Sequence, residues 1–155
     1  MSKITLPARI ENLRRLVQFV SGCARHQGYS ESRTNEIELA AEEALVNICR
    51  YAYPGGEGDI ALRCRRSGRD RIIIEIEDSG IPFDPLSASE PDLRPDIARR
   101  AAGGLGIFLI RKMVNEVHYR RDVNKNILTF IVSPERRPLD ARKEHARSTQ
   151  GRKSA

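Results

Sequence analysis

Glu43 and Asn47 are two polar residues four positions apart in an otherwise apolar helical pattern. Residues at i and i+4 lie on the same side of a helix. An asparagine amide oxygen is a hard ligand suited to Mg²⁺, which fills the rest of its shell with phosphate and water oxygens. A carboxylate one turn earlier can accept a proton from an attacking hydroxyl group. The pair indicates metal-assisted phosphate chemistry, although a solvated helix surface would have the same residue types.

Asp78 and Gly80 follow an apolar, β-branched segment, within the sequence EDSG. A carboxylate is an acceptor and can take a hydrogen bond from the exocyclic amine of adenine. Glycine lacks a Cβ, so the backbone can approach a ligand closely. The same residues are also common in an ordinary turn at a strand end. The segment therefore predicts either an adenine-reading acid or a simple turn.

The sequence GGLG at 103–106 precedes an apolar helical pattern. A helix N-terminus presents free amide groups and the positive end of the helix dipole, which favours phosphate. No Lys-Ser/Thr pair follows the glycines, so the segment is not a P-loop. A glycine hinge before a core helix is the structural alternative. Thr129, on the last predicted strand, offers a hydroxyl group that could reach a ligand, or is simply a good strand former.

The elements that position these residues are predicted in the order helices first, then sheet. Residues 3–6 form a short strand, and Pro7 opens a first helix whose apolar positions run from Ile10 to Ala24. Gly28 ends that helix, and Ser30 or Ser32 caps the second, which stops at 54–56.

The second half of the chain is predicted to be mainly strands. Residues 59–77 read as a hairpin, and 117–121 and 127–132 as two further strands. Residues 79–103 contain four prolines and are expected to be a lid or a disordered segment, followed by a helix after Gly106. The predicted fold class is therefore α+β, a two-layer sandwich with a mostly antiparallel sheet and helices on one face.

Together these segments resemble the GHKL (histidine-kinase-like) ATPase superfamily, and most closely its anti-sigma factor serine/threonine kinases of the RsbW/SpoIIAB-like type. The likeness rests on EEALVN at 42–47, EDSGIPFDP at 77–85 and GGLGIFLIRKMVNEV at 103–117. The resemblance covers residues 3–133. We accordingly predict one ATP-binding kinase domain over 1–133 and a basic, disordered tail over 134–155.

The resemblance implies that ATP and Mg²⁺ are bound and assigns roles to individual residues. Asn47 matches the Mg²⁺-binding asparagine, and Glu43 matches the glutamate regarded as the catalytic base. Asp78 matches the aspartate that reads adenine. The other nucleotide-binding residues that it implies are Gly80, Gly104, Leu105, Gly106 and Thr129.

The implied function is that of an anti-sigma factor which is also a serine/threonine kinase. Such a protein phosphorylates a small antagonist, a STAS-domain protein, and the unphosphorylated antagonist releases the sigma factor that the kinase otherwise holds. Close relatives often carry an arginine directly before the glycine motif, where this chain has Ala101 and Ala102, with Arg99 and Arg100 upstream. The alternative is therefore a module that binds ATP and sequesters partners without phosphorylating them. Homodimers are common among such relatives, and the sequence leaves this open.

Composition disfavours several other classes of protein, and leaves nucleic-acid binding open only through the basic tail. The net charge is +6, but residues 134–155 alone carry seven Lys or Arg and three Asp or Glu, and aromatic residues are 5% of the chain, so we expect no direct nucleic-acid binding. The apolar runs are too short for a membrane span, and we expect a cytoplasmic protein. A histidine kinase is disfavoured because 155 residues leave no room for a dimerisation helix pair.

Overall fold

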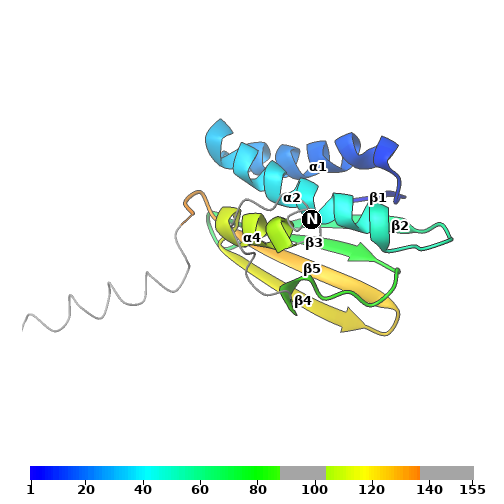
Figure 1. The fold of residues 1–155 in the computed structure, drawn as a ribbon. Helices are drawn as coiled ribbons and strands as arrows, with labels where there is room; N and C mark the ends of the chain where they lie inside the picture. Colours follow the sequence, from blue (N-terminus) through cyan, green and yellow to red (C-terminus); the bar gives the residue numbers. More distant parts are fainter. Residues whose placement is uncertain (88–103, 137–155) are drawn as a thin grey trace, which may run out of the picture.

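The computed structural model describes residues 1–87 and 104–136, which form two layers (Figure 1). One layer is a five-stranded sheet in the order β1-β2-β3-β5-β4, in which every neighbouring pair is antiparallel. Its strands are β1 (Ser2–Pro7), β2 (Asp59–Ser67), β3 (Arg71–Asp78), β4 (Glu116–Asp122) and β5 (Lys125–Val132). The predicted α+β class is confirmed.

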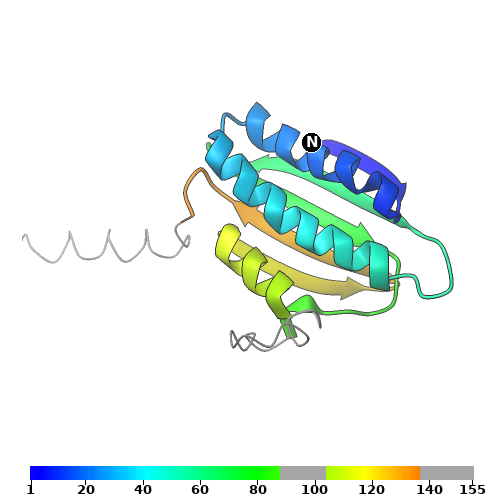
Figure 2. The same cartoon turned by 45° about the horizontal axis from the view of Figure 1, so that its top comes forward.

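The helices form the second layer and cover one face of this sheet (Figure 2). They are α1 (Leu13–His26), α2 (Glu31–Tyr51) and α4 (Gly104–Met113), with short 3-10 turns at Ile10–Asn12 and Pro85–Ser87. Helix α2 lies between α1 and α4 and packs against both. None of the helices in the described part of the chain is long and apolar enough to cross a membrane.

The core lies between the two layers and follows from strand alternation. Every second residue of the three central strands is buried against the helices, as in the series Ile72, Ile74 and Ile76 of β3. The helices contribute small and aliphatic residues, among them Leu16, Ala41 and Leu45. Residues at the intervening strand positions lie on the face that no described helix covers.

Two predictions about element ends have different outcomes. The predicted cap is confirmed at Ser30, whose Oγ accepts a hydrogen bond from the backbone N–H of Arg33 at 3.1 Å. The prediction that Pro7 opens the first helix is wrong, because Pro7 is the last residue of β1 and pairs with Asp59. A proline lacks the N–H donor and is tolerated on an edge strand such as β1.

The ends of several elements meet at one buried cation. Arg33, 3% exposed, donates from Nε to the Ser133 carbonyl at 2.8 Å and from Nη2 to Asn115 Oδ1 at 2.8 Å. Its Nη1 donates to the Met113 carbonyl and to Glu36, the latter at 2.7 Å. Arg33 therefore ties the start of α2 to the end of α4 and to the residue after β5.

Two predicted segments extend beyond the described residues. The loop predicted over 79–103 is described only as far as Ser87, and the tail predicted over 134–155 only as far as Arg136. Arg99, Arg100 and the alanines that precede the glycine motif also lie outside the described ranges. The proposed domain boundary after residue 133 stays a prediction.

Candidate functional site

A pocket opens between the C-terminal half of α2, the first turns of α4 and the adjoining ends of β3 and β5. Its walls are mainly apolar, and three polar side chains face into it: Asn47, Asp78 and Asn126. The apolar lining includes Ala44, Ile48, Ile81, Ile107, Ile110 and Leu128. A concave, mostly apolar site with a few convergent polar groups is the usual form of a small-molecule site.

Asp78 is the last residue of β3 and is only 5% exposed. Its Oδ1 accepts two hydrogen bonds, from the backbone N–H of Gly80 and from Asn126 Nδ2, both at 2.9 Å. Burial raises the pKa of the Asp78 carboxyl, while these two donors and the Arg121 charge oppose the rise. The hydrogen bonds that the described residues make to this side chain both end on Oδ1, so Oδ2 is available to a ligand.

Gly80 is required by a close contact with the end of α2. A Cβ built on Gly80 would lie 2.3 Å from the Ala52 carbonyl oxygen and 2.6 Å from Ala52 Cβ. The same carbonyl accepts a hydrogen bond from the backbone N–H of Ile81 at 2.9 Å. The glycine thus lets the chain after β3 pass directly beneath α2, which places Asp78 at the floor of the pocket.

Tyr53 holds the other side of this junction. Its hydroxyl donates to the Asp59 carbonyl at 2.6 Å and accepts from the backbone N–H of Ser79 at 2.8 Å. A Cβ on Gly58 would lie 2.0 Å from the Tyr53 ring, so a glycine is needed there as well. One tyrosine therefore fixes the chain after α2 to the start of β2 and to the residue that follows Asp78.

Glu43 and Asn47 lie on the face of α2 that meets the start of α4. A Cβ built on Gly106 would lie 3.0 Å from Glu43 Oε2 and 3.7 Å from Asn47 Nδ2. The structure thus brings together the predicted acid, the predicted asparagine and the last glycine of the motif. Desolvation, with a smaller contribution from the neighbouring Glu42 charge, raises the pKa of the Glu43 carboxyl.

Helix α4 begins at Gly104, so Gly104–Gly106 lie in its first turn and the helix starts before the predicted point after Gly106. The first turn of a helix carries unpaired backbone N–H groups. These belong to Gly104, Leu105 and Gly106, and Ile107 in the next position lines the pocket. The helix start and the polar face of α2 therefore border the same space.

Thr129 is a correction to the expected set. It pairs with Glu75 and His118, whereas its neighbours Leu128 and Phe130 belong to the core beneath the helices. Since strand residues alternate between faces, the Thr129 side chain lies on the opposite face from the pocket. The structure therefore places Thr129 outside the lining of this pocket, unlike the other strand residue of the expected set, Asp78.

The residue of β5 that does reach Asp78 is Asn126, which the sequence analysis did not select. It is 6% exposed and takes part in five hydrogen bonds. The signal that could have found it is strand parity, because Asn126 shares a face with the apolar Leu128 and Phe130. A polar residue on an otherwise apolar face is a candidate for a buried polar network.

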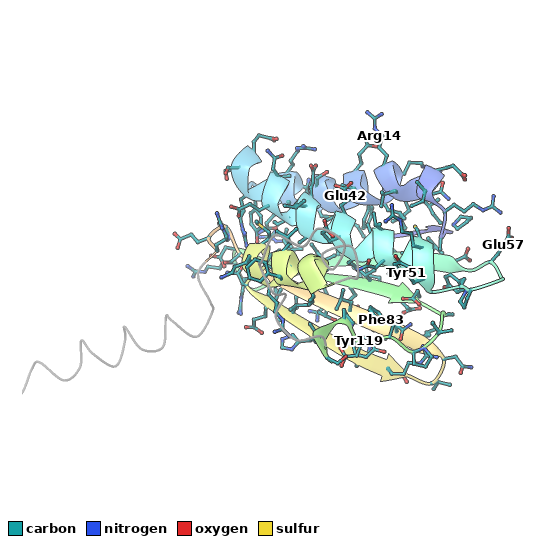
Figure 3. All side chains as sticks on the ribbon, viewed as in Figure 1. Arg14, Glu42, Tyr51, Glu57, Phe83 and Tyr119 are labelled. Carbon is teal, nitrogen blue, oxygen red and sulfur yellow. The ribbon has the colours of Figure 1, made fainter. Side chains whose placement is uncertain are left out.

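The mouth of the pocket is bordered by exposed apolar and aromatic side chains. Tyr51 is 61% exposed, Phe83 56% and Ile81 49%. Tyr51 comes from the end of α2 and Phe83 from the segment after β3, and both line the pocket together with Tyr119 of β4 (Figure 3). Flat aromatic groups at an opening suit a planar ligand or an apolar partner surface.

Comparison with known proteins identifies the family of this site. Residues 6–132 match the model of the histidine kinase-like ATPase domain. Among curated proteins, the chain is 29% identical to the serine-protein kinase RsbW of Halalkalibacterium halodurans, over 96% of this chain and 92% of that protein. It is 28% identical to the serine-protein kinase RsbW of Listeria innocua, over 81% and 84% of the two chains.

Two solved structures share the fold at low identity. The catalytic domain of histidine kinase ThkA has a TM-score of 0.51 and 14% identity, over 86% of this chain and 98% of that one. The histidine kinase domain of a blue-light activated kinase from Erythrobacter litoralis has a TM-score of 0.50 and 18% identity. This comparison covers 90% of this chain but only 64% of that structure's length, so it concerns the fold alone.

Proposed function

The chain belongs to the histidine kinase-like ATPase domain family, and we propose that it is an ATP-dependent serine/threonine protein kinase that also acts as an anti-sigma factor. Its substrate is a serine or threonine of a small STAS-domain antagonist, and it holds a sigma factor until the unphosphorylated antagonist displaces it. The name serine-protein kinase carried by relatives that align over most of this chain supports the kinase assignment.

The observation that carries the proposal is the buried Asp78 carboxylate in an apolar pocket. Oδ1 is held by two N–H donors, and Oδ2 is left to accept the exocyclic amine of adenine. The apolar walls, including Ile48, Ile107 and Leu128, offer surfaces against which a purine ring can pack. Adenine is therefore the base that this pocket suits.

The polar face of α2 is the proposed site of the phosphates and the metal. A side chain at position 106 would crowd Glu43, and glycine leaves the backbone beside Glu43 and Asn47 uncovered. No cluster of three His, Cys, Asp or Glu side chains suited to a metal occurs within residues 1–87 and 104–136. Mg²⁺ needs no such cluster when it is held by one protein oxygen, here that of Asn47, and by phosphates and water. When bound, Mg²⁺ neutralises charge that develops on the phosphates.

Glu43 is proposed to accept the proton of the attacking hydroxyl group. A general base works best when its pKa lies near the working pH, and the pKa of Glu43 is raised towards that range by desolvation and by Glu42. Asn47, one turn later on the same side of α2, orients the phosphate end of the nucleotide. The N–H groups of the first turn of α4 stabilise the phosphate oxygens.

Phosphate transfer to purified STAS-domain proteins from the same genome tests this function. Each candidate is incubated with the chain and γ-labelled ATP in Mg²⁺, beside a version whose acceptor serine is changed to alanine. Glu43→Gln keeps the size of the side chain but removes the base. We expect it to lower the transfer rate by at least about 100-fold while ATP affinity changes less than about threefold.

The outcome also separates the two functional classes. Labelling of a STAS-domain protein that is lost in Glu43→Gln supports the kinase. ATP binding without transfer to any candidate would instead indicate a module that sequesters partners without phosphorylating them. Equal loss of transfer and of ATP affinity in Glu43→Gln would contradict the role of Glu43 as base.

A further inference from the structure

The amide of Asn126 has one orientation that its neighbours allow. Its Oδ1 accepts hydrogen bonds from Tyr119 Oη at 2.7 Å, Arg121 Nη1 at 3.0 Å and the backbone N–H of Phe83 at 3.4 Å. Its Nδ2 donates to Asp78 Oδ1 at 2.9 Å and to the Ile81 carbonyl at 2.8 Å. A half-turn of the amide would set donors against donors and acceptors against acceptors. Asn126 must therefore donate to Asp78.

This orientation determines which oxygen of Asp78 a ligand meets. Oδ1 already accepts from Asn126 Nδ2 and from the Gly80 N–H, so a proton on the carboxyl group must sit on Oδ2. An ionised Oδ2 accepts a hydrogen bond from an amine, whereas a protonated Oδ2 can donate one to an oxo group. The protonation state of Asp78 Oδ2 thus decides whether a base with an amino group or a base with an oxo group is bound.

We propose that Asn126 is a positioning residue that makes Asp78 Oδ2 the atom reading position 6 of the purine, and so sets the preference for a 6-amino over a 6-oxo base. The inference rests on the proposed function, because it takes Asp78 as the residue that reads the base. Asn126 itself has no hydrogen-bonding capacity left for the ligand, since both its donors and its acceptor are engaged.

The charges around Asp78 act in opposite directions, and only that of Arg121 acts with Asn126. Arg121, which also donates to the Gly80 carbonyl at 2.9 Å, favours the ionised carboxylate. Burial and the Glu77 charge on the same strand favour protonation, and Tyr53 lies close enough for its phenol to sense the Asp78 charge. Loss of the Asn126 donor removes one of the groups that keep Asp78 ionised.

The test is calorimetric titration with ATP and with inosine triphosphate, which carries an oxo group at position 6. Wild type is expected to prefer ATP. In Asn126→Leu we expect the ratio of the affinity for ATP to the affinity for inosine triphosphate to fall about tenfold. The fall should come mainly from weaker ATP binding, because one hydrogen bond to a charged group is worth about that factor. If Asn126 only supported the fold, the substitution would weaken the binding of both nucleotides by the same factor. That result would overturn the proposal.

Asn126→Asp guards against simple misfolding, because it keeps the shape and the acceptor for Tyr119 and Arg121. It faces Asp78 with a second carboxylate, so Asp78 is protonated at higher pH than in wild type. As the pH is lowered, the variant should lose ATP affinity at a higher pH than wild type does. An unshifted pH profile would contradict the proposal. Ile131→Val, on the other face of β5, is the matched control and should change neither ratio nor profile.

The proposed ATP site and the proposed role of Asn126 are distinguished by their outcomes. If wild type binds neither nucleotide, the proposed ATP site fails and this inference fails with it. If wild type binds ATP but both Asn126 variants keep its base preference and pH profile, only the role of Asn126 is overturned.

Discussion

Glu43 and Gly106 face each other between α2 and α4, so closely that a methyl group on Gly106 would lie 3.0 Å from Glu43 Oε2. This approach brings the middle of α2 beside the first turn of α4. It places the proposed base beside backbone that is proposed to hold phosphate. The size of residue 106 should therefore control the position of the Glu43 carboxylate.

Gly106→Ala is expected to impair phosphate transfer more than folding. The added methyl group displaces the Glu43 carboxylate slightly. Since a misplacement of about 1 Å can cost about 100-fold in rate, we expect a loss below about 100-fold. Single-turnover transfer to the antagonist measures the effect, and thermal unfolding measures stability. The matched control is Gly22→Ala in α1, where a Cβ meets nothing within 4 Å.

Gly22→Ala should keep full activity and gain about 0.5–1 kcal/mol in the free energy of unfolding, because alanine is the better helix former. If Gly106→Ala transferred phosphate at the wild-type rate, the proposed coupling between α4 and Glu43 would be wrong.

Gly80→Ala should destabilise the fold itself. The new Cβ would lie 2.3 Å from the backbone oxygen of Ala52, which cannot move aside as a flexible side chain could. We expect a loss of about 3 kcal/mol in the free energy of unfolding, typical of an overpacked site. Urea denaturation measures the loss, and a variant as stable as wild type would show that the end of α2 yields without cost.

The sequence predicted the architecture well because local signals were strong. Ser30 is a good N-cap at the start of an apolar helical stripe, and the β-branched run around Ile74 is typical of a strand. Pro7 was placed in the wrong element, because a proline suits both a helix start and an edge strand.

The site was predicted less completely, for reasons that depend on tertiary contacts. Glu43, Asp78 and Gly106 follow from motif spacing, and the structure places Glu43 and Gly106 close together. Thr129 was selected for its hydroxyl group without regard to which face of β5 it occupies. Strand parity marks Asn126 as a polar residue on an apolar face, but its partners Tyr119 and Arg121 come from the neighbouring strand and appear only in the fold.

Arg33→Met should be strongly destabilising although it keeps much of the side chain's volume. It removes the hydrogen bonds that Arg33 donates to Ser133, Met113 and Asn115, and the buried cation beside Glu36. We expect a cost of about 3 kcal/mol in the free energy of unfolding. Arg14→Met on the exposed side of α1 (Figure 3) is the control and should be nearly neutral. Equal stability of the two variants would contradict the anchoring role of Arg33.

Tyr29 should make the fold sensitive to alkali. Burial, with a smaller contribution from the Asp70 charge, raises the pKa of Tyr29 to about 12 from an ordinary value of 10.0. Its hydroxyl donates to the Val132 carbonyl at 3.0 Å and to the Asp70 carbonyl. The stability that this group contributes is present below pH 10 and is lost as the pH rises towards 12.

Urea denaturation at a series of pH values checks this prediction. Tyr29→Phe should be less stable than wild type at neutral pH but should lose less stability between pH 10 and 12. Tyr51→Phe, at a position 61% exposed, is the control. Parallel pH profiles for wild type and Tyr29→Phe would show that Tyr29 does not titrate with unfolding.

The central claim is that Asp78 reads the adenine of ATP, and calorimetric titration of wild type and Asp78→Asn with ATP in Mg²⁺ tests it most directly. The two donors at Oδ1 would hold the new amide with its oxygen towards Asn126 and Gly80, so that its NH₂ group faces the pocket and opposes the adenine amine. The account predicts that wild type binds ATP and that Asp78→Asn weakens binding by at least about tenfold. Equal ATP affinity of the two proteins, or no ATP binding by wild type, would contradict it.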